Sequence, residues 1–180
     1  MATTNASARG AFAFCDIAGF TAFTAERGDD AAIELVATFG AHAAAGLPPG
    51  GRIVNRIGDG LLLHFAEPAT AVTTLLDLTD RCADVATPDS PLWVRTGVHV
   101  GEARLLGDDL IGHDINVAAR IGELAGAAEV LVSETARSAE AGEGVRFEAL
   151  GPAFVKGLRD PLRLYRASRV DARRPAPALP

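Results

Sequence analysis

The segment RIVNRIGDGLLLHF, residues 52–65, restricts the possible folds of this chain more than any other stretch. Two apolar runs rich in Ile and Leu flank Asp59-Gly60, and Asp-Gly is a favoured two-residue turn of type I′, with positive φ at both positions. The segment LPPGG, residues 47–51, breaks the helix that precedes it. The sequence therefore predicts a β-hairpin that follows directly on a helix break.

Apolar periodicity on either side of the hairpin predicts the neighbouring elements. The segment DDAAIELVATFGAHAAA has helical spacing, and LWVRTGVHVG alternates as a strand does. The predicted order is strand 12–17, helix 29–45, the hairpin, helix 69–83 and strand 92–101. This order matches the ferredoxin-like βαββαβ unit, an α+β fold with an antiparallel sheet and helices packed on one face.

The remainder of the chain predicts an α/β extension of this core. A further helix is expected to begin near Asp114, whose carboxylate can cap the first free N–H groups. The segments EVLVS, FEAL and LRLYR indicate three short strands, with a helix at 133–140. We expect a flexible N-terminus over 1–10, one domain over 11–168, and a disordered tail rich in Pro and Ala over 169–180.

Composition limits the classes of function. With 180 residues and 48 % apolar content the chain fits one domain, and its net charge of -6 argues against nucleic acid as a partner. No run is long enough to span a membrane and the start does not resemble a signal peptide, so we expect a cytoplasmic protein without a membrane partner. Cys15 and Cys82 indicate buried reduced thiols, and the four His residues lack the spacing of metal ligands.

Two carboxylates stand at positions that a sheet can bring together. Asp16 follows the first strand and Asp59 lies in the hairpin turn, and a local structural role explains each residue taken alone. In an antiparallel sheet the end of the first strand can lie beside that turn. Two converging carboxylates repel unless cations separate them, and two Mg2+ or Mn2+ ions about 4 Å apart serve phosphoryl transfer.

The segment LIGHDINVAARIGELA, residues 110–125, predicts a helix with one polar stripe. Asn116 and Arg120 lie one turn apart on the same face, and apolar residues cover most of the remainder. Two interpretations stay open. The stripe is either a solvated face with an Arg120–Glu123 ion pair or a site for phosphate and sugar, in which Arg spreads charge over a transferring phosphoryl group.

Five motifs in order resemble those of the class III adenylyl/guanylyl cyclase catalytic domain. They are FCDIAGFT, IGDGLLLHF, RTGVHVGEA, GHDINVAARI and VKGLRDPLRLYR. The resemblance runs from about Phe12 to Tyr165. It implies that Asp16 and Asp59, with the backbone of Ile17, hold two divalent cations, Mg2+ or Mn2+.

The same resemblance implies roles for residues that bind the nucleotide. Asn116 would orient the ribose, Arg120 would stabilise the transition state at the α-phosphate, and Lys156 would hold the terminal phosphates. In this family these groups come from one chain and the metal ligands from its partner. The resemblance therefore implies a head-to-tail homodimer with active sites at the interface.

The residues that select the base depart from the family pattern. Adenine-selective members carry Lys four residues before the second metal Asp, and this chain has Asn55 there. Their Asp seven residues before the transition-state Asn corresponds to Asp109, which can accept from the adenine amino group. The amide of Asn55 both donates and accepts, so it could serve adenine N1 or favour guanine.

The expected function is that of an adenylate cyclase, which converts ATP to 3′,5′-cyclic AMP and pyrophosphate through in-line attack by the ribose 3′-hydroxyl. One alternative is a guanylyl or dual-specificity cyclase. Another is a catalytically silent cyclase-like module that binds a nucleotide or a partner. The complete set of five motif residues argues against the silent module: Asp16, Asp59, Asn116, Arg120 and Lys156.

Overall fold

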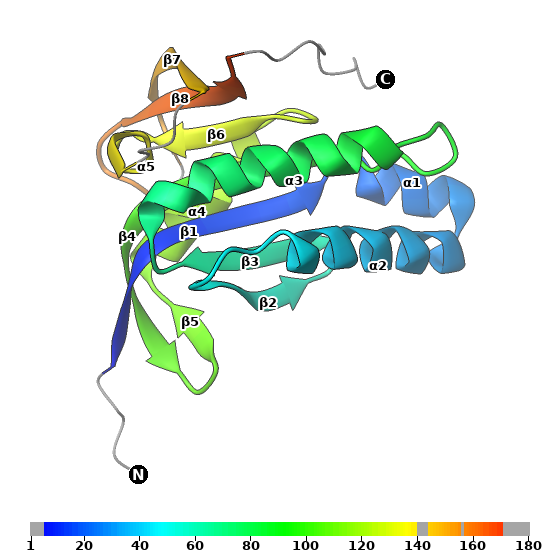
Figure 1. Cartoon of the computed structure of the whole chain (residues 1–180), viewed down its shortest axis with the longest axis horizontal. Helices are drawn as coiled ribbons and strands as arrows, with labels where there is room; N and C mark the ends of the chain where they lie inside the picture. The colour runs from blue at the N-terminus through cyan, green and yellow to red at the C-terminus, as the bar shows by residue number, and fades with distance from the viewer. Residues whose placement is uncertain (1–5, 140–143, 156, 171–180) are drawn as a thin grey trace.

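The computed structural model describes residues 6–139, 144–155 and 157–170 (Figure 1). Its elements, in chain order, are β1 (Ser7–Ile17), α1 (Phe20–Arg27), α2 (Asp29–Ala45), β2 (Gly51–Ile57), β3 (Gly60–Phe65), the 3-10 turn η1 (Pro68–Thr70), α3 (Ala71–Val85), β4 (Val94–Leu106), β5 (Asp109–Ile111), α4 (His113–Leu124), β6 (Val130–Ser133), α5 (Glu134–Ala139), β7 (Val145–Ala153) and β8 (Leu162–Arg169). None of the helices formed by these residues is long and apolar enough to cross a membrane.

The described strands form one sheet in the order β2-β3-β1-β4-β6-β8-β7, and β5 pairs with β4. The first four strands of this order have the arrangement of a ferredoxin-like unit, so the predicted α+β class and βαββαβ unit are confirmed. The α/β extension adds one parallel pair to this antiparallel unit. β4 and β6 run parallel because the chain crosses from one to the other through α4.

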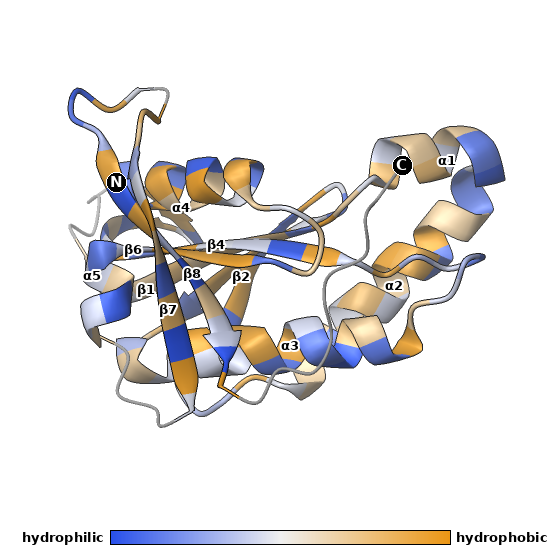
Figure 2. Ribbon diagram, turned by 90° about the horizontal axis from the view of Figure 1, so that it is seen from above, coloured by the Kyte–Doolittle hydropathy of each residue, from blue (hydrophilic) through white to orange (hydrophobic). Residues whose placement is uncertain are grey.

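Helices cover both faces of the sheet (Figure 2). On one face α2 and α3 bury Leu35, Phe39 and Leu75 with Ala11 and Ala13 of β1. The prediction that helices cover one face holds for this pair. α4 lies on the opposite face, because alternate residues of β1 are also apolar and pack against it.

The β2–β3 turn differs from the predicted Asp59-Gly60 turn. Ile57 pairs with Gly60, so the two turn residues are Gly58 and Asp59. Gly58 has φ +61°, whereas Asp59 has no positive φ, so the expected type I′ geometry is wrong. Gly60 belongs to β3 because it is buried against the ring of Phe14, where a Cβ would lie 3.2 Å from Phe14 Cε1.

The chain ends also differ from expectation at one point. β1 begins at Ser7 because residues 7–10 pair with Gly101–Arg104 of β4, so these residues are strand and not a flexible N-terminus. Residues 1–5 and 171–180 lie outside the described residues. Cys15 and Cys82 are buried free thiols, as predicted.

Candidate active site

Asp16 and Asp59 lie together at one end of the sheet, and we call them the carboxylate pair. β1 pairs with β3 up to Cys15 and Leu61, which brings the β2–β3 turn beside the end of β1. Burial raises the pKa of Asp59, and the charge of Asp16 raises it further, while backbone hydrogen bonds from Asp59 and Ile17 lower it. The predicted convergence of the two carboxylates is therefore present, with their mutual repulsion.

Arg95 is a residue of this site that the sequence reasoning missed. It lies opposite Asp16 in the β1–β4 pairing, its Nε contacts Asp16 Oδ1, and its Nη2 donates to Oδ2 at 3.1 Å. Alternation in β4 buries Val94 and Thr96 and turns Arg95 to the other face. That alternation was visible in the sequence, but the register that pairs Arg95 with Asp16 was not.

The carboxylate pair fits divalent cations of the Mg2+ and Mn2+ type, which prefer oxygen ligands. Within the described residues Asp59 forms no salt bridge, so its charge is not neutralised by a direct cationic partner. In the described part of the chain no three or more Asp, Glu, His or Cys side chains are arranged so that they alone could hold a metal ion. Ions at this pair would therefore need main-chain oxygens such as that of Ile17, water or phosphate to complete their coordination.

Asn55 and Asp109 are brought together from positions 54 residues apart. Asn55 Nδ2 donates to Asp109 Oδ2 at 3.3 Å, across the contact between β2 and β5. The backbone N–H of Arg56 donates to Asn55 Oδ1 at 2.7 Å. Because the amide oxygen is occupied by this N–H, the amide group of Asn55 presents N–H donors on the side of Asp109.

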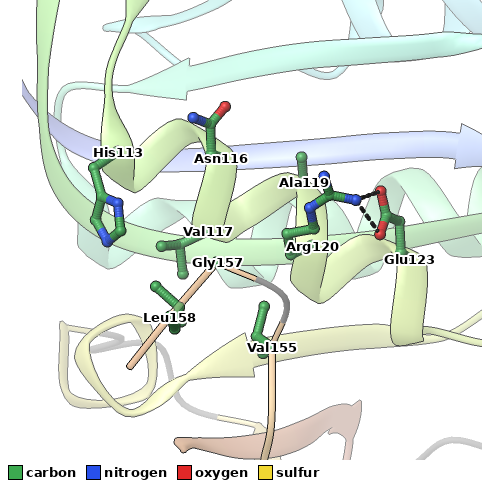
Figure 3. Close-up of a pocket in the computed structure, with 9 residues that line it drawn as sticks. All are labelled: His113, Asn116, Val117, Ala119, Arg120, Glu123, Val155, Gly157 and Leu158. Atoms are coloured by element: carbon green, nitrogen blue, oxygen red, sulfur yellow. Dashed lines mark hydrogen bonds and ion pairs between the residues drawn. The ribbon is translucent and has the colours of Figure 1, made fainter. Parts of the chain in front are cut away.

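A pocket of about 390 Å3 lies between α4 and the segment before β8, and we call it the α4 pocket (Figure 3). It is lined by His113, Asn116, Val117, Ala119, Arg120, Glu123, Val155, Gly157 and Leu158. Arg120 Nη1 donates to both carboxylate oxygens of Glu123, at 2.7 and 2.8 Å. The ion pair of the first interpretation is thus present, and Arg120 and Asn116 also line a pocket.

Lys156 lies outside the described residues. Its neighbours Val155 and Gly157 line the α4 pocket together with Asn116 and Arg120. The described lining of this pocket contains neither Asp16 nor Asp59. Within one chain the structure therefore assembles two separate groups of predicted site residues, the carboxylate pair and the α4 pocket.

The two groups lie on the same face of the sheet. Alternation along β1 places Asp16 on the face of Phe12 and Phe14, which is the face that α4 covers. Contact with Asp16 raises the pKa of Arg95, and the charges of Asp59 and Glu123 raise it further. The charge of Glu123, at the end of α4, thus acts on the residue that holds Asp16.

Comparison with known proteins identifies the family. The family described as the adenylate and guanylate cyclase catalytic domain matches residues 7–168, and the chain belongs to this family. It is 29% identical over 161 residues to the pH-sensitive adenylate cyclase of Mycobacterium tuberculosis, covering 87% of this chain and 40% of that protein. The chain spans less than half the length of the curated relatives it matches.

Solved structures share the fold at low sequence identity. The adenylyl cyclase CyaB from P. aeruginosa matches with a TM-score of 0.77 and 23% identity, covering 94% of this chain and 98% of that one. The guanylyl cyclase Cya2 matches with a TM-score of 0.81 and 18% identity, covering 96% and 98%. The fold is thus common to cyclases of both base preferences, and the chain's own residues must decide between the bases.

Proposed function

We propose that this chain is an adenylate cyclase that converts ATP to 3′,5′-cyclic AMP and pyrophosphate. The observation that carries the proposal is the orientation of Asn55, whose oxygen accepts from Arg56 and whose Nδ2 donates toward Asp109. A donor amide beside a carboxylate acceptor complements adenine, because adenine N1 accepts and its amino group donates. Guanine presents the reverse pattern at these two positions, and Asp109 would repel its O6.

The catalytic roles follow from the chemistry of the two groups. Divalent cations held by Asp16 and Asp59 would lower the pKa of the ribose 3′-hydroxyl and neutralise phosphate charge. Asn116 would orient the ribose, and Lys156 would hold the terminal phosphates. The 3′-oxygen attacks the α-phosphorus in line and pyrophosphate leaves, so the reaction needs no protein nucleophile.

Arg120 can exchange its present partner for phosphate at little cost. Its pair with Glu123 is a partly exposed i, i+3 contact, a type that contributes only about 0.2–0.5 kcal/mol. Hydrogen bonds to charged groups contribute about 1.5–3 kcal/mol when they are better desolvated. A phosphoryl group in the α4 pocket would therefore draw Arg120 away from Glu123, and the ion pair does not argue against a catalytic role.

We propose that the active sites are shared between two copies of the chain. The carboxylate pair and the α4 pocket form separate groups within one chain, so a head-to-tail partner would supply the missing group to each. Exposed apolar side chains on the β4–β5 hairpin support association with a partner: Leu105, Leu106 and Ile111. A nucleoside triphosphate substrate also supports a cytoplasmic location.

A guanylyl or dual-specificity cyclase is the second candidate, favoured by the presence of Asn55 where adenine-selective members carry Lys. The deciding experiment measures cyclic nucleotide and pyrophosphate formation with ATP and with GTP, in Mg2+ and in Mn2+. We expect product from both triphosphates with a higher kcat/KM for ATP. A higher kcat/KM for GTP would support the second candidate, and no product in any condition would support a silent nucleotide-binding module.

A further inference from the structure

A polar cluster lies beneath the first turn of α4, outside the two groups described above. His99, on β4, is the centre of this cluster and its side chain is only 12% exposed. His99 Nδ1 lies 2.9 Å from Ser133 Oγ, and His99 Nε2 lies 3.6 Å from Asp114 Oδ1. Asp114 Oδ2 accepts from the backbone N–H of Glu102 at 2.7 Å. The cluster therefore joins β4, β6 and α4.

The serine, histidine and aspartate of this cluster do not form a hydrolytic site. Ser133 is completely buried, so no substrate can reach its hydroxyl. Its Oγ also accepts from the backbone N–H of Ala136 at 3.3 Å, at the start of α5, and lies 3.0 Å from Thr135 Oγ1. The hydroxyl is engaged in structure, and the cluster has a role other than nucleophilic catalysis.

Asp114 connects α4 to β4 and does not cap its own helix. The sequence predicted that its carboxylate would cap the helix, but α4 has no side-chain cap, and both carboxylate oxygens face β4. The fit is close, because a Cβ at Gly101 would overlap the carboxylate of Asp114. The helix is thus tied to the sheet at its second residue, two positions before Asn116.

A second attachment fixes the other half of α4. A Cβ at Gly97 of β4 would overlap the backbone of Gly122 and Ala118, so the helix lies directly on the strand there. With one attachment at each end, α4 can neither rotate about its axis nor slide along β4. Asn116 and Arg120, which line the α4 pocket, lie on the segment between these two attachments.

We propose that Asp114, held by the backbone N–H of Glu102 and flanked by His99, is a positioning residue for Asn116 and Arg120. The inference rests on the proposed function of the α4 pocket. Transition-state groups must be placed to within a fraction of an ångström, and a displacement of about 1 Å can cost on the order of 100-fold in rate. Loss of the Asp114 carboxylate would release the first turn of α4 and misplace both side chains.

The test uses mixed dimers of two inactive variants, Asp59→Ala and Arg120→Ala. In the mixed dimer the one complete site takes its α4 groups from the Asp59→Ala chain and its metal ligands from the Arg120→Ala chain. Asp114→Ala added to the Asp59→Ala chain should reduce the recovered activity by on the order of tenfold or more. The same substitution on the Arg120→Ala chain should leave the recovered activity unchanged, because its α4 serves the dead site.

Equal losses in both placements would overturn the proposal, because they would indicate a general role of Asp114 in folding or association. No loss in either placement would overturn it as well. If the two inactive variants fail to recover activity without Asp114→Ala, the shared site itself is wrong. Positioning is then judged on Asp114→Ala in the otherwise unmodified enzyme: a fall in kcat at constant KM for ATP supports it, and unchanged kcat overturns it.

His64→Gln is the matched control for stability. His64 is a strand histidine too and is buried, with Nε2 3.2 Å from the backbone oxygen of Arg9 and its ring stacked on Phe12. His99→Gln and His64→Gln should lower the melting temperature by similar amounts. Only His99→Gln should also lower kcat, by roughly the loss seen with Asp114→Ala. Equal kcat for the two histidine variants would remove His99 from the proposal.

Discussion

The carboxylate pair and the α4 pocket are built in opposite ways from the same chain. Three paired strands fix the carboxylate pair, both of its side chains are partly buried, and Arg95 holds one of them. The α4 pocket is a single helix face opposite Val155, Gly157 and Leu158, and its Asn116 is exposed. Among the described residues, Arg120 pairs with Glu123 of the same helix. The two carboxylates converge on one another within the chain, whereas the polar side chains of the α4 pocket lie on the exposed side of a helix.

This difference matches what each group would require under the proposed function. A cation site needs ligands at fixed short distances, which paired strands provide. A site for a nucleotide shared with a partner needs exposed groups that keep their orientation, which a helix attached at both ends provides. We therefore expect substitutions in the carboxylate pair to abolish activity directly. Substitutions beneath α4 should lower activity by displacing Asn116 and Arg120.

The largest effect should come from Asp59→Asn, which keeps the turn but removes one carboxylate. Turnover should fall on the order of 100-fold or more, because a cation loses a ligand. Burial raises the pKa of Asp59 in the fold, so its ionised form is disfavoured there and the melting temperature should stay constant or rise. Steady-state assays and thermal melts measure both quantities, and near-normal turnover would reduce Asp59 to a turn residue.

Arg120→Ala should lower kcat by roughly 100-fold, the scale of loss when one donor to a developing charge is removed. Glu123→Gln is its matched control, because it removes the same ion pair from the other side. The exposed pair contributes only tenths of a kcal/mol, so Glu123→Gln should change kcat less than about threefold. Similar losses of kcat in both variants would show that the ion pair has a structural role and that Arg120 has no catalytic role of its own.

Base choice should respond by a smaller factor. Asn55→Lys places a group that can only donate opposite adenine N1, and the ratio of kcat/KM for ATP to that for GTP should rise by about tenfold. Asp109→Ala should relax the preference, because it removes the acceptor for the adenine amino group. A ratio that does not change in either variant would show that other parts of the pocket select the base.

The smallest expected effect is a pH dependence of stability that comes from His99 and His64, on the sheet face that α4 covers. Burial lowers the pKa of both His99 and His64 in the fold. For His99 the nearby charge of Asp114 opposes this shift and His113 adds to it. Each imidazole binds a proton more readily in the unfolded chain, so the free energy of unfolding falls as pH drops through the unfolded value of about 6.5.

Thermal melts at about pH 7.5 and about pH 5.5 should show this loss, and His99→Gln should make it smaller. Melts of His64→Gln measure the contribution of the second imidazole. An identical pH dependence in the wild type and in both variants would mean that neither histidine contributes.

The sequence predicted the features that depend on local pattern. The helix at 29–45 matches α2 at both ends, and Asp16 and Asp59 converge because their positions at a strand end and a hairpin turn determine it. It missed α1, which has eight residues and none of them fully buried, and β5, which has only three residues.

Features that depend on tertiary pairing could not be predicted from the sequence. The contact of Arg95 with Asp16 requires the β1–β4 register, which no local pattern encodes. From its residue type and place in the sequence, Asp114 was expected to cap the helix. Its carboxylate instead accepts a hydrogen bond from the backbone N–H of Glu102 in β4. The contacts of His99 could not be predicted from the sequence, because Ser133 lies in β6 and Asp114 in α4.

We propose that each active site combines the carboxylate pair of one chain with the α4 pocket of another. Asp59→Ala and Arg120→Ala, each inactive alone, should restore activity when mixed in equal amounts. Random exchange makes half of the dimers mixed, with one intact site in each, so roughly a quarter of wild-type cyclase activity should return. No recovery at any mixing ratio, with the mixed dimer demonstrated by differently tagged chains, would contradict the claim and place the whole site within one chain.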